Sequence, residues 1–272
     1  MSSRSTLVIS ASRRTDLVAW FPEVLCDKLE RIGPDRIHTL VVWTKDPSNM
    51  LRHKRLNEML SSLDQIFLHL TVTGLGGSEL EPGVPPPDAV TEHLPALVRL
   101  LGNPQRIRWR FDPILVWECG NEKFSNMDKF PDMAGAFLSN GVTRAITSIC
   151  LLYPKVRKRF RYHGRFAPVE LSTDLRTEIR ARISSEASRL GMELSWCCEP
   201  GERPAGCIDG KTLSDLHPHS RPAPIDRARG QRDGCSCTRS WDIGWYNEVC
   251  RGGCLYCYAN PVLTRNRSEG SE

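Results

Sequence analysis

Residues 37–73, IHTLVVWTKDPSNMLRHKRLNEMLSSLDQIFLHLTVT, contain one complete strand–helix–strand unit. The run Ile37–Trp43 is apolar and rich in β-branched residues, which is typical of a strand buried in a parallel sheet. A helix is predicted to begin near Ser48 or Asn49, and the apolar run Ile66–Thr73 predicts the next strand. Parallel strands need a crossover of this kind, so the unit predicts two parallel neighbours in one sheet.

The same alternation of strands and helices extends along the first two-thirds of the chain. Six strands are predicted: Thr6–Ser10, Ile37–Trp43, Ile66–Thr73, Arg106–Leu115, Ala145–Leu152 and Met192–Cys198. The further helices predicted between them are Pro22–Gly33, Asp88–Leu101, Asp128–Leu138 and Asp174–Leu190. Right-handed crossovers would curl such a sheet, so the predicted fold class is α/β, a (β/α) barrel or partial barrel of about six parallel strands. An open doubly wound sheet is the alternative.

Periodicity disappears from residue 200 onward, where Pro, Gly and Arg become frequent. We therefore expect residues 1–199 to form the barrel-like core. Residues 200–272 are expected to form a Cys-rich segment, interpreted below from the spacing of its cysteines, that packs over the C-terminal ends of the strands as part of one structural unit.

The composition is that of a soluble globular protein, with 40% hydrophobic and 25% charged residues among 272. The net charge of +5 permits an anionic ligand or nucleic acid without arguing for either. The apolar run Leu7–Ile9 is too short for a signal peptide, and no run approaches a membrane span. The expected location is the cytoplasm, with no membrane association.

Eight of the eleven cysteines follow residue 196, and three of them form the motif Cys250-x3-Cys254-x2-Cys257. In a reducing compartment such crowding favours metal binding over disulfides. Three thiolates cannot complete a closed tetrahedral zinc site. They can bind three irons of a [4Fe–4S] cluster and leave the fourth iron open. With Tyr256 before its last cysteine, the motif resembles that of the radical S-adenosylmethionine (SAM) enzymes, in which SAM binds the open iron.

A second group of cysteines lies between the core and this motif. Its predicted members are Cys198, Cys207, Cys235 and Cys237. Four thiolates suit a closed zinc site or an auxiliary [4Fe–4S] cluster. Cys197 is interpreted as the weaker ligand of its adjacent pair, because a cysteine in a strand is often a small buried hydrophobe.

Charged side chains follow the predicted strands at the edge where barrels bind ligands. The candidate catalytic and binding residues are Arg13, Arg14, Asp16, Lys45, Arg110, Asp112 and Glu199. The two N-terminal arginines and Lys45 are candidates for the SAM carboxylate or an anionic substrate. Asp112 and Glu199 could bind ribose or amine groups or carry protons. The alternative is that these are solvated loop charges and that Arg110–Asp112 is a structural ion pair.

Four segments together resemble the bacterial domain-of-unknown-function family 1848. They are SASRRTD (residues 10–16), WTKDP (43–47), WRFDPI (109–114) and CSCTRSWDIGWYNEVCRGGCLYCYAN (235–260). The resemblance runs along nearly the whole chain and implies a cysteine cluster related to that of radical SAM proteins. It implies no particular reaction.

The leading hypothesis is therefore an enzyme that binds a [4Fe–4S] cluster and SAM for radical chemistry on an unknown substrate. A flavodoxin or ferredoxin would serve as electron donor. A redox or regulatory iron–sulfur protein without SAM chemistry is one alternative. A zinc-stabilised nucleic-acid-binding protein is another, because residues 155–165 form a basic run with interleaved aromatics, although nucleic acid is not the expected partner.

The leading hypothesis also predicts a geometry. The tail should turn at Asp242-Ile243-Gly244, with the isoleucine in the barrel mouth, and bring the three sulfurs to the C-terminal ends of the strands. There they should face Arg13, Lys45, Arg110 and Asp112 across a cavity of the usual ligand-pocket size, ~300–1,000 Å³.

Overall fold

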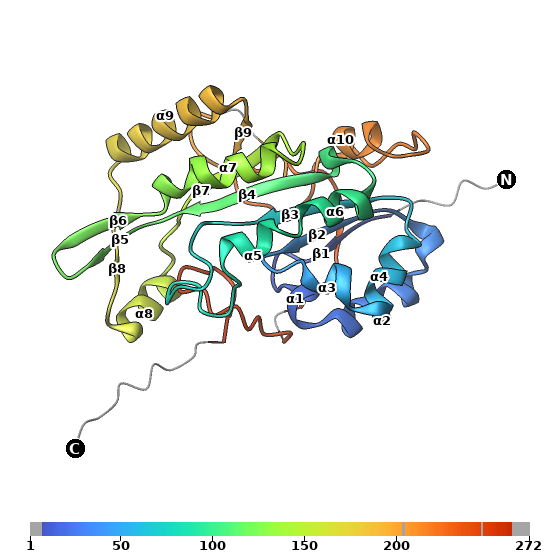
Figure 1. Cartoon of the computed structure of the whole chain (residues 1–272), viewed down its shortest axis with the longest axis horizontal. Helices are drawn as coiled ribbons and strands as arrows, with labels where there is room; N and C mark the ends of the chain where they lie inside the picture. Colours follow the sequence, from blue (N-terminus) through green and yellow to red (C-terminus); the bar gives the residue numbers. More distant parts are fainter. Residues whose placement is uncertain (1–6, 203–204, 246, 263–272) are drawn as a thin grey trace, which may run out of the picture.

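The computed structural model describes residues 7–202, 205–245 and 247–262. Its main element is a sheet of seven parallel strands in the order β10-β1-β2-β3-β4-β7-β9 (Figure 1). These strands are β1 (Leu7–Ala11), β2 (Ile37–Thr44), β3 (Ile66–Thr71), β4 (Ile107–Ile114), β7 (Arg144–Ile149), β9 (Glu193–Trp196) and β10 (Trp241–Asp242).

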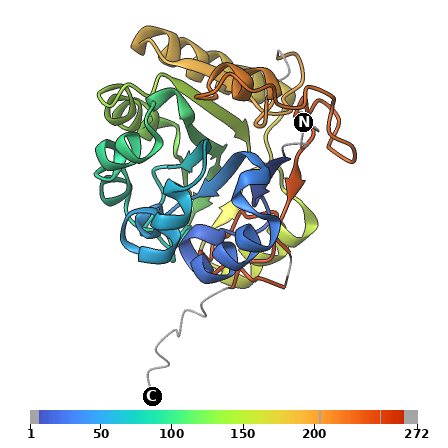
Figure 2. The same ribbon diagram turned by 90° about the vertical axis from the view of Figure 1, so that its right-hand side faces the viewer.

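All six strands predicted from the sequence are present, and they lie side by side in chain order. The order never reverses, as a doubly wound sheet would require, so that alternative is wrong. The arrangement is consistent with a partial α/β barrel, seen along the strands in Figure 2. Within the described residues the edge strands β9 and β10 do not pair, so closure of the barrel is not shown. Thr6 of the first predicted strand and Tyr246 of the quoted tail lie outside the described residues.

The helices between residues 17 and 138 and the helix at residues 173–190 cover the outer face of the sheet (Figure 2). The helix at residues 154–163 packs with the cysteine motif, and the helix at residues 210–215 lies on the concave side. The helices are α1 (Leu17–Trp20), α2 (Pro22–Ile32), α3 (Ser48–Arg52), α4 (Lys54–Ser61), α5 (Pro87–Thr91), α6 (Leu94–Leu101), α7 (Phe130–Leu138), α8 (Pro154–His163), α9 (Thr173–Leu190) and α10 (Gly210–Asp215). The helix predicted over residues 88–101 is divided into α5 and α6, because Pro95 has no N–H to continue the ladder. The helix predicted from residue 48 is divided at His53, whose ring accepts the Leu56 N–H at 3.3 Å and begins α4.

Successive side chains of each strand point to opposite faces of the sheet, so two hydrophobic cores form, one on each face. Leu40, Leu68 and Trp109 point outward and pack against the helices. Val41 and Phe67 point to the concave face, where the side chains that cover them come from the Cys-rich segment and include Cys207, Ile208, Leu213 and Cys237. The buried side chains within residues 205–238 therefore form an inner layer of the molecule, whereas residues 229–234 of the same segment are exposed.

The Cys-rich segment visits both ends of the sheet. At the N-terminal ends of the strands, Gln65 Nε2 donates to Leu213 O at 2.9 Å and Arg106 Nη2 donates to Leu216 O at 2.7 Å. The chain then returns as β10 beside β1 and carries residues 250–258 toward the C-terminal ends (Figure 1). The prediction that the whole extension lies over the C-terminal ends is wrong for residues 205–238, which instead bury the apolar concave face.

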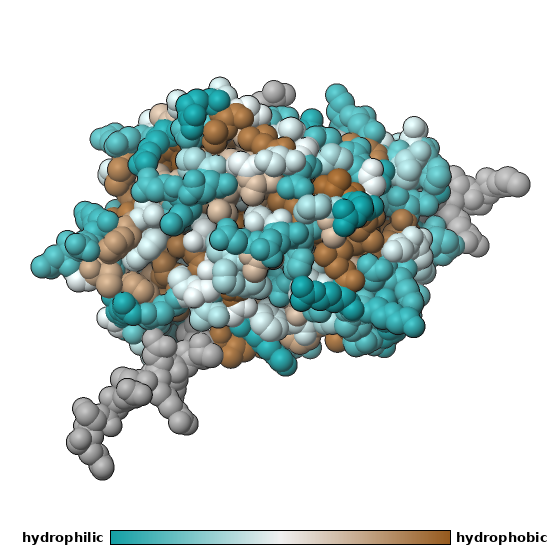
Figure 3. Space-filling model, in the orientation of Figure 1, coloured by the Kyte–Doolittle hydropathy of each residue, from teal (hydrophilic) through white to brown (hydrophobic). Residues whose placement is uncertain are grey.

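A three-stranded antiparallel sheet, in the order β6-β5-β8, extends from the end of β4. Its strands are β5 (Val116–Cys119), β6 (Glu122–Ser125) and β8 (Ala167–Pro168). Figure 3 shows hydrophobic residues on one face of the molecule in separate patches between hydrophilic ones. Among the described residues, no helix combines the length and apolar character needed to cross a membrane.

Candidate functional site

The cysteine motif packs against the loop that follows β3. Leu255 N donates to Leu80 O, and Gly83 N donates to Gly252 O, both at 3.1 Å. A Cβ on Gly83 would lie 2.4 Å from the Arg251 carbonyl oxygen, so this close approach of two loops requires glycine. The motif is thus held by backbone contacts to a loop at the C-terminal end of a barrel strand.

The motif positions its sulfurs around a glycine. A Cβ on Gly252 would lie 3.5 Å from Cys250 Sγ and 3.7 Å from Cys254 Sγ, so both sulfurs flank the same open point. The Ala259 N–H donates to Cys257 Sγ at 3.3 Å, and backbone N–H groups of Asp16 and Gly252 donate to Cys250 Sγ. Donors aimed at sulfur favour the thiolate form that binds metals.

These residues fit an iron–sulfur cluster better than a single ion. In the described part of the chain, no group of three or more His, Cys, Asp or Glu side chains is arranged to hold one metal ion. In a [4Fe–4S] cluster each thiolate binds a different iron, so the sulfurs stand farther apart than those around one zinc. Two of the three thiols flank one point, and N–H groups are directed at Cys250 and Cys257, which suits a cluster that each thiolate binds through a different iron.

Without metal, the three thiols are protonated at neutral pH. Burial raises the pKa of Cys250 and Cys257 above the usual thiol range, and it raises the pKa of Cys254 well above it. Lys45 opposes this effect at Cys254 and Cys257. Coordination to metal deprotonates a thiol outright, so loading of this site should release protons.

A buried carboxylate connects the motif to the barrel. Glu81 Oε1 accepts hydrogen bonds from Thr73 Oγ1 at 2.6 Å, from Lys45 Nζ at 2.9 Å and from the Tyr256 hydroxyl. Lys45 Nζ lies 3.0 Å from that hydroxyl as well. Burial lowers the pKa of Lys45, but the charge and hydrogen bond of Glu81, together with the charges of Cys254 and Asp112, more than offset it. The pKa therefore lies above its ordinary value and the ammonium stays charged. Our selection of site residues from the sequence omitted Glu81, although it lies in a loop after a barrel strand.

Arg159 of α8 holds the motif from the opposite side. Its guanidinium donates to the carbonyl oxygens of Leu255 at 3.0 Å, Ala259 at 3.0 Å, Cys254 at 3.3 Å and Cys257. This residue lies within the basic run of residues 155–165 and is buried. The sequence signal was its position three residues after Val156 and one before Phe160, both apolar, on one helix face.

The first strand-end segment is used mainly for structure. Asp16 caps α1 by accepting the Ala19 N–H at 2.9 Å, and it also accepts the Thr44 hydroxyl at 2.9 Å and the Lys45 N–H at 2.8 Å. Burial raises the pKa of Asp16 to about 6. Arg14 Nη1 donates to Gly244 O at 3.0 Å, so it holds the chain after β10.

Arg13 connects the two cysteine groups. Its backbone carbonyl accepts the Tyr258 hydroxyl at 2.5 Å, next to the motif. Its guanidinium lies 4.9 Å from the centre of the Trp43 ring and donates to Cys237 Sγ at 3.4 Å. Arg110 occupies a corresponding position, 5.1 Å from the same ring, and donates to Cys207 Sγ at 3.2 Å.

Arg110 and Asp112 form the ion pair that the sequence offered as a structural alternative. Asp112 accepts from Arg110 through one oxygen and from Ser148 through the other. Both side chains lie on the concave side of β4, and the charge of Asp112 reaches Lys45, Cys150 and Tyr258. The hydrogen bonds of Asp112 are therefore made within the barrel, as a structural ion pair requires. The pair nevertheless lies close to the cysteine motif.

Glu199 faces the helical layer. Its carboxylate accepts the Ile149 N–H at 3.0 Å and pairs with Arg176 at 2.8 Å and Arg180 at 3.8 Å, both from α9. The position after β9 was predicted, but the side chain fastens that strand end to α9 instead of joining the cysteines.

In the second cysteine group, the sulfurs that contact one another include Cys197 besides the predicted Cys207, Cys235 and Cys237. The thiols of Cys197 and Cys237 donate to Cys207 Sγ and hold its pKa well below the usual range, and Cys235 contacts Cys237. Cys198 is half-buried, and its sulfur lies 3.8 Å from that of Cys197. The structure therefore brings Cys197, the member ranked as the weaker ligand, into the sulfur network. The reason is alternation: Trp196 points to the outer core, so Cys197 points to the concave face.

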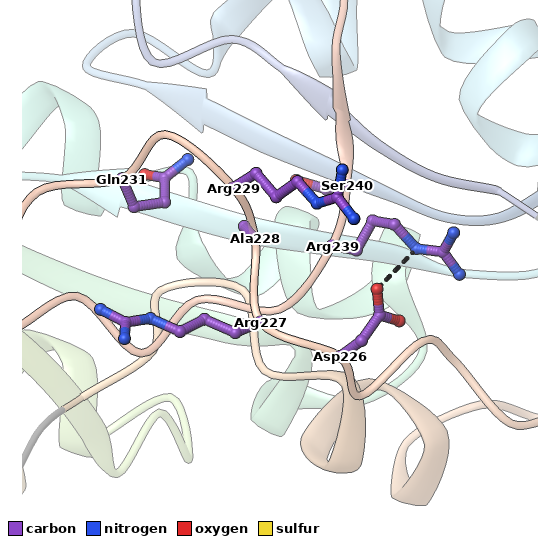
Figure 4. A pocket seen from close by; sticks show the side chains of 7 residues that line it. All are labelled: Asp226, Arg227, Ala228, Arg229, Gln231, Arg239 and Ser240. Carbon is purple, nitrogen blue, oxygen red and sulfur yellow. Dashed lines mark ion pairs between the residues drawn. The ribbon is translucent and has the colours of Figure 1, made fainter.

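A pocket of about 500 Å³ lies on the segment that leads into β10 (Figure 4). Its lining residues are Asp226, Arg227, Ala228, Arg229, Gln231, Arg239 and Ser240. None of the predicted site residues lines it, so it is not the SAM cavity expected beside the sulfurs. Arg239 pairs with Asp226 at 3.0 Å, and Arg227 points away from Arg229 and Arg239 in Figure 4, so its arginines do not converge on one anion.

Fold and site define a parallel α/β protein with a thiol-rich C-terminal segment. The chain belongs to the family described as domain of unknown function (DUF1848), whose pattern matches residues 30–259. No curated protein matches the chain.

Solved structures resemble the chain only distantly. Streptococcus suis SuiB covers 73% of this chain and 50% of its own, with 12% identity and a TM-score of 0.37. SuiB bound to S-adenosylmethionine matches with 11% identity and a TM-score of 0.35 over 73% of this chain and 51% of its own. The carboxyl transferase domain of Rhizobium etli pyruvate carboxylase, with pyruvate and biocytin, covers 96% and 42%, with 12% identity and a TM-score of 0.40. The chain thus spans 42–51% of the length of these proteins, and likeness at this level carries no argument about fold or function.

Proposed function

We propose that this protein is an iron–sulfur enzyme in which Cys250, Cys254 and Cys257 bind a [4Fe–4S] cluster whose open iron binds SAM. The observation that carries the proposal is the place of the motif in space. It follows β10, which lies at the sheet edge beside β1, and it reaches Lys45 at the end of β2. In the enzymes that the motif resembles, the cysteines follow the first strand of the barrel. Here β10 takes the first place in the sheet although it comes last in the chain.

The residues around the motif suit a ligand with a carboxylate and polar groups. When bound, the cluster would supply the electron that cleaves SAM reductively and begins radical chemistry. Lys45, kept charged by Glu81, would bind a carboxylate. Asp112, oriented by Arg110 and Ser148, would accept hydrogen bonds from an amine or hydroxyl group. We assign Arg13, Arg14, Asp16 and Glu199 to holding the strand ends that position these groups.

Anaerobic reconstitution with iron and sulfide tests the proposal. We expect about four irons per chain at this site and, with SAM and dithionite, formation of 5′-deoxyadenosine detected by chromatography. Cys254→Ala should abolish both, whereas Cys119→Ala, a thiol of the β5–β6 hairpin, should change neither. Iron binding without SAM cleavage would favour the redox alternative. Unchanged iron content in a variant lacking Cys250, Cys254 and Cys257 would contradict the cluster assignment.

The partners follow from this chemistry. SAM cleavage needs a low-potential electron donor, for which a flavodoxin or ferredoxin is proposed, and the substrate class stays open. Within the basic run, Arg159 and Phe160 are buried and support the cysteine motif. The other cationic residues of the run are exposed, so the nucleic-acid alternative rests on these alone: Lys155, Arg157, Lys158, Arg161 and Arg165.

A further inference from the structure

A network of buried sulfurs lies on the concave face, separate from the motif at residues 250–257. Cys197, Cys207, Cys235 and Cys237 are each less than one-tenth exposed. Cys207 contacts Cys197 and Cys237, and Cys237 contacts Cys235, so the four sulfurs form one continuous chain of contacts. They come from three separate stretches of the sequence, so their meeting is a product of the fold.

The surroundings of these sulfurs are cationic. Arg110 Nη1 donates to Cys207 Sγ at 3.2 Å, and Arg13 Nη2 donates to Cys237 Sγ at 3.4 Å. Both guanidinium groups are braced by the face of Trp43. Neutral thiols are weak acceptors, and two partly buried arginines beside them favour sulfurs that carry negative charge. Four thiolates with a divalent metal, or with a [4Fe–4S]²⁺ core, would carry two negative charges. Arg13 would offset one of them, and Arg110, which also pairs with Asp112, would offset part of the other.

We propose that Cys197, Cys207, Cys235 and Cys237 bind a second thiophilic metal centre, either one Zn²⁺ or an auxiliary [4Fe–4S] cluster. Four thiolates and no open position make a closed structural site. In the described residues no three of these sulfurs surround one point, because the contacts run in a line from Cys197 to Cys235. Metal binding would therefore have to draw the two ends of this line together. Cys198 is excluded because it is half-buried and its sulfur contacts the network only through Cys197.

The centre would fasten the inner layer to the sheet. Cys207 lies on the segment that covers the concave face, where its carbonyl lies 2.8 Å from His69 Nε2. Cys235 and Cys237 lie just before β10, the strand that carries the other cysteine motif. Metal binding here would fix the start of β10 and, through Arg13 and Arg110, the side chains that face the proposed SAM site.

Metal content of the full-length protein tests the proposal independently of the proposed function. The background is a variant with Cys250, Cys254 and Cys257 changed to Ala, which removes the first site. In it we expect one zinc per chain, or about four irons with sulfide, by elemental analysis. Adding Cys207→Ser or Cys197→Ser should abolish this metal, and adding Cys198→Ser, the matched neighbour, should leave it unchanged. Loss with Cys198→Ser and retention with Cys197→Ser would overturn the ligand set.

A measurement on the unsubstituted chain covers the case in which these variants fail to fold. Thiol labelling of the folded protein should leave residues 197, 207, 235 and 237 unmodified until a chelator is added, while Cys198 reacts from the start. Mass spectrometry of the labelled peptides reads each position. Rapid labelling of all five, together with metal-free protein after growth in zinc- and iron-supplemented medium, would overturn the proposal even if the first site binds its cluster.

Discussion

Glu81 is the side chain that joins the cysteine motif, the barrel and the proposed ligand-binding lysine. One of its oxygens accepts from Thr73, Lys45 and Tyr256, and the side chain is almost fully buried. Glu81→Gln removes the charge that compensates the Lys45 ammonium. Loss of one partner of a buried ion pair costs about 3 kcal/mol or more, so we expect a decrease of that size in the free energy of unfolding by urea titration.

Tyr256→Phe is the matched comparison for this substitution. It removes a neutral hydrogen-bond donor from the same oxygen, and a hydrogen bond of this kind contributes about 1 kcal/mol. The tyrosine variant should therefore be clearly more stable than the glutamine variant. Equal losses in the two variants would show that the charge of Glu81 does not matter to the fold.

His217 predicts how stability depends on pH. Burial, and then the nearby His38 and Arg221, lower its pKa from the ordinary 6.5 to about 4. Between these pH values His217 is protonated in the unfolded chain and neutral in the folded chain. The free energy of unfolding should therefore fall as pH decreases from 6.5 toward 4. At pH 5 the contribution of this group is about 2 kcal/mol less than at pH 7.5. Urea titrations of the wild type and His217→Gln at both pH values should show a smaller pH effect in the variant; equal effects would contradict the assignment.

Strand alternation settles some residue positions from the sequence and leaves others open. Trp196 is a large apolar residue, which predicts that its side chain points to the outer core. Because successive side chains of a strand alternate, Cys197 is then predicted on the concave face. The interpretation of the adjacent Cys198 as a stronger ligand than Cys197 stays a prediction. No local pattern, however, distinguishes Glu199, which pairs with α9, from Asp112, which lies near the cysteines. Their different partners come from elements far away in the chain.

At the scale of elements, β10 forms because of its hydrogen bonds to the end of β1 and not because its residues have a high intrinsic strand propensity. Asp242 accepts from the Ser12 hydroxyl at 2.7 Å and from the Ser10 hydroxyl at 3.2 Å, and the Ile243 N–H donates to Ser10 O at 3.0 Å. Ile243 is buried, as expected, but in the outer core. The predicted turn is wrong: this stretch runs straight beside β1, and Gly244 is needed because of its closeness to Ser12.

Gly244→Ala should therefore displace β10 and, with it, the cysteine motif that follows β10 in the chain. An added Cβ would lie 2.1 Å from Ser12 Oγ and 2.3 Å from Ser12 Cβ, so β10 must shift. We expect a loss of about 2 kcal/mol or more in stability, together with reduced iron uptake. Gly135→Ala in α7 is the control, since nothing lies within 4 Å of its added Cβ, and it should be neutral or stabilising by up to about 1 kcal/mol. Similar behaviour of both variants would refute the close-contact argument.

Helix α8 predicts a local effect. Arg159 donates to carbonyl groups across residues 254–259, so Arg159→Met should loosen this loop while the barrel strands stay intact. Hydrogen exchange should become at least ~10-fold faster in peptides covering residues 250–259, because each 1.4 kcal/mol of lost local stability raises the open population tenfold. Lys158→Met, on the exposed side of the helix, should leave these rates unchanged. Faster exchange throughout the sheet would instead indicate global destabilisation.

At the scale of the molecule, the sequence predicted the repeated βα units and not what fills their concave face. Hydrophobic periodicity reports each strand and helix because it depends on neighbours along the chain. The covering of Val41 and Phe67 by residues 205–238 has no such period, since those residues contact the sheet through isolated side chains such as Ile208 and Leu213. This Pro- and Gly-rich segment therefore has the sequence pattern of a surface loop, although several of its side chains form an inner layer.

This inner layer predicts that the barrel core cannot fold alone. A fragment of residues 1–199 would expose Val41, Phe67 and Ile146 on its concave face, and it would lose β10 from the edge of β1. We expect it to be insoluble or to bind the dye ANS strongly, whereas the full chain should unfold in a single transition by circular dichroism. Co-expression of residues 200–272 as a separate chain should restore a soluble complex, because the two pieces then rebuild the same buried interface. A soluble, monomeric 1–199 fragment with a cooperative transition and no dye binding would show that the segment is an accessory to the core and not one of its layers.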